Sequence, residues 1–201
     1  MVIAYVGSGG KTTLLKKRAR VCREAGMKVF VTTSTHMYIE DDTLLTDDAE
    51  IIIRCLAETG YAMAGVRHGE KIGPLPDAVY RRVCEAADVV LVEADGSRQL
   101  PIKFPAEGEP VIYNNVDEIV VVCGLHALGR KAREVCHRLE LVKECLGISD
   151  ETLITADHIR RLVLEGYVRP LREKYPEKKI IVQPNCDGSA GQTVPMQDFH
   201  L

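Results

Sequence analysis

Short runs of β-branched and other apolar residues recur along the chain, and stretches with helical periodicity lie between them. Several of the short runs are continuously apolar, which indicates strands covered on both faces. The predicted strands are Val2–Val6, Lys28–Thr33, Ala62–Val66, Asp88–Glu93, Glu118–Cys123 and Lys179–Val182. The predicted helices are Lys11–Ala25, Asp47–Glu58, Asp77–Ala86, Lys131–Leu146 and Ala156–Glu165.

The ends of two helices carry their own signals. Gly26 follows the first helix in the position that favours a left-handed residue, and Thr155 and Asp157 are candidate N-caps of the last one. Because strands alternate with helices, the pattern predicts βαβ units and a mostly parallel sheet. We therefore expect a doubly wound α/β fold.

Composition limits the class of protein. The 201 residues are 46% hydrophobic and 27% charged, which is typical of a globular chain. We expect one domain over residues 1–187 and an irregular tail over residues 188–201. The net charge of −3 argues against nucleic acid as a partner, and apolar runs such as Ile119–Cys123 are too short to cross a bilayer.

Seven cysteines are present, and none forms a Cys-x-x-Cys pair. This spacing argues against a zinc knuckle or a redox motif. Cys22, Cys84 and Cys123 lie among apolar residues, where a thiol packs like a small hydrophobic group. Reduced thiols, together with an N-terminus that does not resemble a signal peptide, predict a cytoplasmic protein.

A glycine-rich segment follows the first predicted strand and opens the first predicted helix. It reads Gly7-Ser8-Gly9-Gly10-Lys11-Thr12-Thr13. A standard P-loop has another glycine six residues before its lysine, and here Tyr5 occupies that position. The strand–loop–helix context nevertheless predicts a shortened phosphate-binding loop, because glycines and a helix N-terminus together present backbone N–H groups to an anion.

Each residue of this loop has an expected role. Gly7, Ser8, Gly9 and Gly10 would surround the phosphates with backbone amides, and Lys11 would place an ammonium group on the β- and γ-phosphates. The hydroxyl of Thr12 would bind Mg²⁺, with Thr13 beside it. The expected fold is thus a P-loop NTPase-like three-layer sandwich, with ATP or GTP and Mg²⁺ as cofactors. The alternative is a glycine turn that caps a helix, with a solvated lysine.

Acidic residues end another predicted strand. Four apolar residues lead into Glu93, and Asp95 follows two positions later, on the same face if the strand continues. Either carboxylate is a candidate Mg²⁺ ligand, directly or through water, and Glu93 is also a candidate to orient the attacking water. The alternative is a strand that simply ends in acids before a turn.

Two further segments are candidates for the same site. The hydroxyl-rich stretch Thr32-Thr-Ser-Thr-His-Met37 follows the second strand, and ligands bind outside the carboxyl ends of strands in open α/β sheets. Arg98, Lys103 and Glu107 lie in a long Pro-rich segment of the kind that often forms a lid or a binding element. Lys103 is the preferred candidate for charge stabilisation during catalysis.

These motifs together resemble the YqeC-type family of selenium-dependent hydroxylase accessory proteins. The resemblance rests on the glycine-rich loop, Thr32–Met37, Val92-Glu-Ala-Asp-Gly-Ser-Arg98, Leu100-Pro-Ile-Lys103, Pro105-Ala-Glu107 with Glu109-Pro-Val-Ile112, Gly124-Leu-His-Ala-Leu-Gly-Arg130 and Cys136-His-Arg138. It implies a P-loop nucleotide-binding protein that helps selenium-dependent molybdenum hydroxylases to mature. The implied partners are such a hydroxylase or the proteins that mature its cofactor.

The nucleotide base stays open. The family often shows an Asn-Lys-x-Asp-like sequence near the last strand, and here Gln183-Pro-Asn-Cys-Asp187 has proline where the asparagine is expected. The sequence therefore predicts ATP or GTP without a choice between them.

Three functions fit these residues. The first is an Mg²⁺-dependent NTPase, with Lys11, Glu93 and Lys103 as catalytic residues and Thr12, Glu93 and Asp95 around the metal. The second is a small-molecule kinase or ATP-dependent ligase, because Mur-type ligases share the Gly-x-x-Gly-Lys-Thr-Thr spacing. The third is a non-catalytic binding module gated by nucleotide, in which slow hydrolysis acts as a timer.

Overall fold

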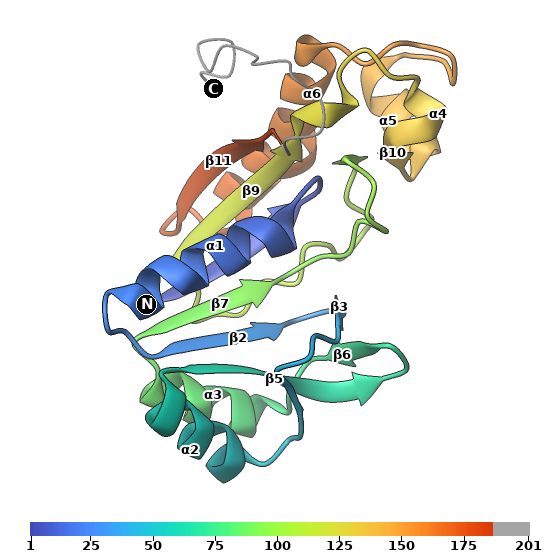
Figure 1. Cartoon of the computed structure of the whole chain (residues 1–201). Coiled ribbons are helices and arrows are strands. Elements are labelled where there is room, and N and C mark those ends of the chain that lie inside the picture. The colour runs from blue at the N-terminus through green and yellow to red at the C-terminus, as the bar shows by residue number, and fades with distance from the viewer. Residues whose placement is uncertain (187–201) are drawn as a thin grey trace. The chain divides into compact units, whose positions relative to one another are not determined.

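All six predicted strands form in the computed structural model, which describes residues 1–186 (Figure 1). The predicted tail and Asp187 lie outside the described residues. The described chain divides into two compact units. The first comprises Met1–Tyr5, Thr12–Gly96 and Pro110–Glu118; the second comprises Val6–Lys11, Ser97–Glu109 and the chain from Ile119 onward. The prediction of a single domain over residues 1–187 stays a prediction.

The elements follow one another along the chain. The first ten are β1 (Val2–Gly7), α1 (Lys11–Glu24), β2 (Val29–Thr33), β3 (Met37–Tyr38), β4 (Thr43–Leu45), α2 (Ala49–Thr59), β5 (Tyr61–His68), β6 (Lys71–Gly73), α3 (Asp77–Ala86) and β7 (Val89–Glu93). The others are β8 (Ile102–Lys103), β9 (Glu118–Gly124), the 3₁₀ turn Leu125–Ala127, α4 (Ala132–Val135), β10 (Cys136–His137), α5 (Leu139–Leu146), α6 (Ala156–Val163), the π-helical turn Leu164–Val168, α7 (Arg169–Lys174) and β11 (Lys179–Asn185).

The first unit is built on a mostly parallel sheet flanked by helices. Its strand order is β1-β7-β2-β5-β6-β3, and β4 pairs with β5. The pairs β1–β7, β7–β2, β2–β5 and β4–β5 are parallel, whereas β6 is antiparallel to both of its neighbours. This is the α/β architecture that the alternation of strands and helices predicts.

The core of the first unit explains this arrangement. β2 and β7 are buried along their whole length, and the apolar residues that begin each of them are typical of strands covered on both faces. On α1, Leu15, Ala19 and Cys22 are buried at helical spacing, so one face of this helix packs inward. α2 packs against β5 and α3 (Figure 1).

The observed helix caps agree only in part with those predicted from the sequence. Gly26, two residues after the end of α1, has φ +77°, the left-handed conformation that its position predicts. Thr155 is the N-cap of α6 and forms a capping box with His158. Asp157 is not a cap, because it lies in the first turn of α6 and pairs with Arg160 at 2.7 Å.

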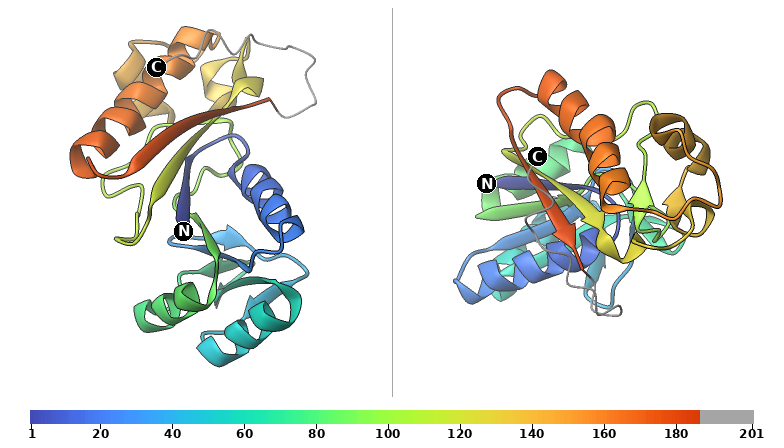
Figure 2. Two further views of the ribbon diagram at one scale, coloured as in Figure 1. Left: turned by 90° about the vertical axis from the view of Figure 1, so that its left-hand side faces the viewer. Right: turned by 90° about the horizontal axis from the view of Figure 1, so that it is seen from above.

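In the second unit, β11 lies beside β9, and one continuous helical segment runs from α6 to α7 next to them (Figure 2). This segment extends beyond the predicted end at Glu165. A π-helical turn over Leu164–Val168 joins its two parts, and Pro170 lies in the first turn of α7. The wider turn accommodates a proline, which has no N–H group to donate within a helix.

The prediction of one continuous helix over Lys131–Leu146 is wrong in the middle of this range. α4 ends at Val135, and Cys136 and His137 pair in parallel with Ile102 and Lys103 of β8. Arg138 then adopts a left-handed conformation with φ 60°, and α5 begins after it. Pairing with a distant strand therefore overrides the helical periodicity of this stretch.

All seven cysteines are free thiols. Burial raises the pKa of Cys123 to about 12 and the pKa of Cys136 to about 11, so both thiols stay protonated at neutral pH. Within residues 1–186, no helix is both long and apolar enough to pass through a bilayer.

Candidate functional site

The glycine-rich segment forms the predicted strand–loop–helix unit. β1 runs through Gly7, Ser8–Gly10 turn the chain, and α1 begins at Lys11. Tyr5, which stands in the place of the missing first glycine, is a buried strand residue in register with Glu93 of β7. The strand continues through this position, so the loop is shorter than a standard P-loop.

The glycines of the loop leave no room for side chains. Gly7, Gly9 and Gly10 have φ values of +89°, +81° and +119°. A Cβ atom on Gly9 would lie 2.3 Å from the Cα atom of Gly124 and 2.9 Å from the Pro101 carbonyl oxygen. A side chain here would therefore clash with backbone atoms, in addition to the cost of its left-handed conformation.

Three distant segments of the second unit hold the loop in place. The Ser8 amide donates to the Val122 carbonyl at 2.9 Å, and the Ser8 hydroxyl donates to the Pro101 carbonyl at 3.0 Å. Buried Asn185, at the end of β11, donates from Nδ2 to the Gly9 carbonyl at 2.8 Å. The backbone shape of the loop is thus fixed before any ligand binds.

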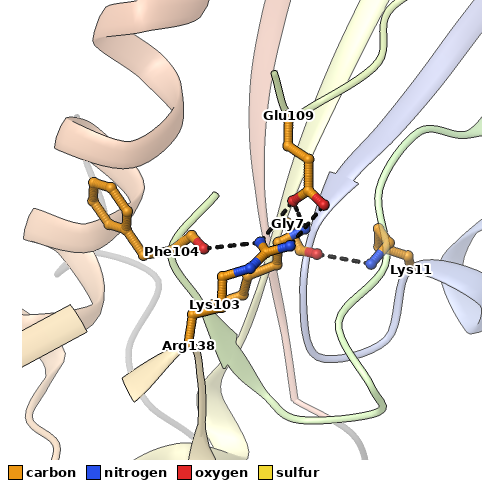
Figure 3. Close-up of polar contacts among 6 residues, drawn as sticks. All are labelled: Gly7, Lys11, Lys103, Phe104, Glu109 and Arg138. Carbon is orange, nitrogen blue, oxygen red and sulfur yellow. Dashed lines mark hydrogen bonds and ion pairs between the residues drawn. The ribbon is translucent and has the colours of Figure 1, made fainter. Parts of the chain in front are cut away.

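Lys11 is buried at the first position of α1. Its Nζ donates to the Gly7 carbonyl at 2.7 Å, so the side chain folds back along the loop (Figure 3). The first amides of a helix have no carbonyl partner within the helix and carry partial positive charge. An ammonium group and these amides therefore converge where the loop meets α1.

In the first unit, Thr12 meets one of the predicted acidic residues. The Thr12 hydroxyl donates to Oε2 of Glu93 at 2.8 Å. Glu93 is the last residue of β7 and is buried, in register with Thr33 of β2. β7 ends here, so Asp95 follows it in a loop, where its side chain is fully buried. Thr13 follows Thr12 and is partly buried.

The hydroxyl-rich segment after β2 mainly links backbone segments. Thr32 donates to the Ala64 carbonyl at 2.9 Å, and Thr33 donates to the Glu93 carbonyl at 2.7 Å. The Ser34 hydroxyl donates to the Val111 carbonyl at 2.6 Å. These hydroxyl protons are used within the fold, and the predicted contribution of this segment to a ligand site stays a prediction.

His36 has a different environment from these hydroxyls. Its exposed ring contacts the ring of His68, with centroids 4.6 Å apart. Partial removal from water, and then the charges of His68 and Lys71, lower the pKa of His36. His36 is therefore a neutral surface ring at pH 7.

Lys103 lies in the short strand β8 rather than in an irregular loop, and its side chain is fully buried. Its Nζ pairs with Oε2 of Glu109 at 2.6 Å (Figure 3). Arg138 holds the same carboxylate with both terminal nitrogens, at 2.7 and 2.8 Å, and also donates to the Phe104 carbonyl at 3.3 Å. We call Lys103, Glu109 and Arg138 the ion cluster.

The ion cluster changes the acid–base properties of its members. Burial alone would raise the pKa of Glu109, but hydrogen bonds from Arg138 and Lys103 outweigh it and hold this pKa at about 2. Burial, and then the charges of Arg138, Lys103 and Arg98, lower the pKa of His137. His137 is thus neutral at pH 7, and the carboxylate is ionised.

Sequence reasoning misses three residues at these sites. Glu109 and Arg138 belong to the motifs of the resemblance, but the sequence assigns them no role, and it favours exposed Glu107 over Glu109. Asn185 stands out only as part of a poor match to a base-reading motif. β11 extends three residues beyond the predicted end and finishes at Asn185. A polar residue at the carboxyl end of an apolar strand is a signal that could have marked Asn185 as a candidate site residue.

The packing of Gly9 gives a first prediction. We expect Gly9→Ala to lower the free energy of unfolding by about 1–3 kcal/mol more than Gly69→Ala, because both alanines are strained but only the first clashes with backbone. Gly69 is the matched control, with φ +63° and no atom within 4 Å of the position that a Cβ atom would take. Urea unfolding of both variants measures the difference; equal losses would contradict the packing described.

The ion cluster gives a second prediction. The pKa of Glu109 is lower in the folded state than its ordinary value of 4.5, so its stabilising effect is present above pH 4.5 and is lost as the pH falls towards 2. We expect Glu109→Gln to cost up to about 3 kcal/mol of stability at pH 7 and much less near pH 2.5.

Urea unfolding of wild type and variant over this pH range measures the effect. Exposed Glu107 provides the control, because Glu107→Gln should change stability little at any pH. A penalty for Glu109→Gln that did not shrink in acid would contradict the prediction.

The comparisons with known proteins agree with the resemblance found in the sequence. The family model described as YqeC protein matches residues 3–140. The chain is also 32% identical over 166 residues to a protein of Escherichia coli (strain K12) named "Uncharacterized protein YqeC". This match covers 78% of the chain and 65% of the relative, so the chain spans just under two thirds of the relative's length. No solved structure matches the chain significantly. By its sequence, the chain belongs to the YqeC family.

Proposed function

We propose that this protein binds a nucleoside triphosphate with Mg²⁺ at the loop Gly7–Thr13 and hydrolyses it. The observation that carries the proposal is the position of Lys11, whose buried ammonium group lies along the glycine loop at the N-terminus of α1. Backbone amides and a cation at one point form an anion site. A polyphosphate is the ligand that best matches a glycine loop followed by lysine and threonine.

Residues of the first unit fit the metal that such a ligand brings. Thr12 and Glu93 already meet through a 2.8 Å hydrogen bond, and Asp95 follows close in sequence. Hydroxyl and carboxylate oxygens are the donors that Mg²⁺ prefers. When bound, Mg²⁺ would neutralise charge on the phosphate oxygens. Because Lys11 and Thr12 are consecutive, one ligand can engage both.

The residues present also suit phosphoryl transfer to water. Glu93 carries a carboxylate that can accept a proton from, or orient, an attacking water. Lys103 is held in place by Glu109 and supplies a fixed positive charge. Catalysis by positioning and charge stabilisation needs no covalent intermediate on the protein.

The biological role that we propose is that of an accessory factor for selenium-dependent molybdenum hydroxylases. Its support is the family resemblance alone, and the matched relative is itself named as uncharacterized. In this role, nucleotide binding would control contact with a hydroxylase or with the proteins that mature its cofactor.

Lys11→Ala tests the phosphate site. We expect the variant to lose about 2 kcal/mol of nucleotide binding, or roughly thirtyfold in affinity, because a charged hydrogen-bond donor to phosphate disappears. Phosphate release should fall with it. The measurements are calorimetric titration with ATP and GTP and a phosphate-release assay.

Lys17→Ala on the exposed face of α1 is the matched control and should behave like wild type. Equal binding by the Lys11 and Lys17 variants would exclude the proposed site. Binding without turnover in wild type would instead favour a nucleotide-gated binding module.

Thr12→Val tests the metal site. Wild type should bind nucleotide more tightly with Mg²⁺ than without it, and Thr12→Val should reduce this gain by about tenfold or more, since one oxygen donor is removed. Thr12→Ser keeps the hydroxyl and should restore the gain. If valine and serine gave the same dependence on Mg²⁺, Thr12 would have no part in metal binding.

A further inference from the structure

Gly10 differs from the other glycines of the loop in what lies against it. A Cβ atom on Gly7 or Gly9 would clash with backbone atoms, whereas a Cβ atom on Gly10 would clash with the side-chain amide of Asn185. The same amide donates from Nδ2 to the Gly9 carbonyl at 2.8 Å. Buried Asn185, at the end of β11, therefore lies directly against the peptide unit that joins Gly9 to Gly10.

This peptide unit offers little steric resistance to rotation. Gly9 and Gly10 have φ values of +81° and +119°, and neither carries a Cβ atom that would oppose a turn of the plane between them. The Gly9 carbonyl is in a buried residue, so it needs a hydrogen-bond donor. The bond from Asn185 supplies this donor and selects the direction in which the peptide plane faces.

The direction of the Gly9 carbonyl also sets the direction of the Gly10 amide. A trans peptide is planar, and its C=O and N–H groups point in opposite directions. Because the carbonyl faces Asn185, the Gly10 N–H points away from Asn185. Gly10 immediately precedes Lys11, where α1 begins, so this N–H adds one donor to the amides at the start of the helix.

The loop is open to solvent at this residue. Gly7, Ser8, Gly9 and Lys11 are buried, whereas Gly10 stays partly exposed. A phosphate group that reached the loop here would meet the Gly10 N–H in the observed orientation of the peptide. In the reverse orientation it would meet the Gly9 carbonyl oxygen, which repels an anion.

We propose that Asn185 is a positioning residue of the phosphate site, which holds the Gly9–Gly10 peptide with the Gly10 N–H towards a bound polyphosphate. Asn185 acts through the Gly9 carbonyl and does not itself contact the ligand. This inference rests on the proposed function, because its ligand is the polyphosphate expected at the loop. It makes the end of β11 part of that site.

Two other roles of Asn185 have different consequences. A purely structural Asn185 would stabilise the fold and leave the affinity of the folded protein for phosphates unchanged. An Asn185 that contacts the nucleotide base would affect ATP and GTP unequally and would not affect a ligand that has no base. Inorganic tripolyphosphate has no base, so it separates these roles.

The first test is Asn185→Leu, which removes the donor and adds no charge. We expect the variant to bind inorganic tripolyphosphate and non-hydrolysable analogues of ATP and GTP about tenfold more weakly than wild type, because one oriented amide-to-phosphate hydrogen bond is lost. The factor should be the same for the three ligands. Calorimetric titration of the full chain with Mg²⁺ measures the affinities, and the Tm shows that the variant is folded.

The second test switches the hydrogen bond by pH in one variant. In Asn185→Asp, an ionised carboxylate repels the Gly9 carbonyl, whereas a protonated carboxyl group donates to it as the amide does. We expect this variant to bind tripolyphosphate at least about tenfold more weakly than wild type at pH 8 and to approach wild type at pH 5. The ratio of the wild-type affinity to that of Asn185→Leu should be the same at both pH values.

Asn115→Asp is the matched control, because it adds the same charge at an exposed position. It should bind tripolyphosphate like wild type at both pH values. The amide signal of Gly10 in ¹H–¹⁵N NMR spectra gives a second readout. Tripolyphosphate should shift the Gly10 amide proton downfield in wild type and in Asn115→Asp, but not in Asn185→Leu.

The proposal is overturned if folded Asn185→Leu binds tripolyphosphate as tightly as wild type, or if its loss is confined to one of the two nucleotides. It is also overturned if the deficit of Asn185→Asp does not shrink in acid. Failure of the proposed function looks different, because then wild type itself binds neither tripolyphosphate nor the nucleotides.

Discussion

The glycine loop is shaped by contacts of backbone with backbone. Gly9 lies against Gly124 and the Pro101 carbonyl, and Gly7 lies so close to Val122 that a Cβ atom would be 2.2 Å from its carbonyl oxygen. Ser8 also donates hydrogen bonds to the Val122 and Pro101 carbonyls, and Asn185 donates one to the Gly9 carbonyl. Interiors packed at this density deform little, so the loop presents one arrangement of amides to a ligand. Lys11, β8 and the end of β11 are positioned by their connections to this tightly packed loop.

The local parts of this arrangement are accessible from the sequence. An apolar run followed by glycines, lysine and an amphipathic stretch predicts β1, the loop and α1 without any long-range information, because hydrophobic periodicity and glycine turns act over a few residues. The same is true of β7, whose apolar residues end in Glu93. Whether these elements bind nucleotide is a matter of chemistry that a fold alone does not decide.

The long-range parts are not accessible in this way. Arg138 reaches Glu109 only because Cys136 and His137 leave the predicted helix to pair with β8. Residues 131–146 have helical periodicity, and no nearby residue indicates the competing strand partner. Asn185 likewise contacts Gly9 across 176 positions of sequence. Tertiary pairing decides such cases, and propensity is too weak to oppose it.

The π-helical turn between α6 and α7 has a consequence for the spacing of buried residues. Ile159 and Leu171 are both buried, but twelve residues of regular α-helix would rotate them about 120° apart. A π turn absorbs one residue, which leaves the equivalent of eleven, or about three full turns, and brings both side chains to one side. The segment Leu164–Val168 therefore acts as a spacer. Losing one residue there would leave the helical phase intact, whereas the same loss inside α6 or α7 would turn apolar side chains towards water.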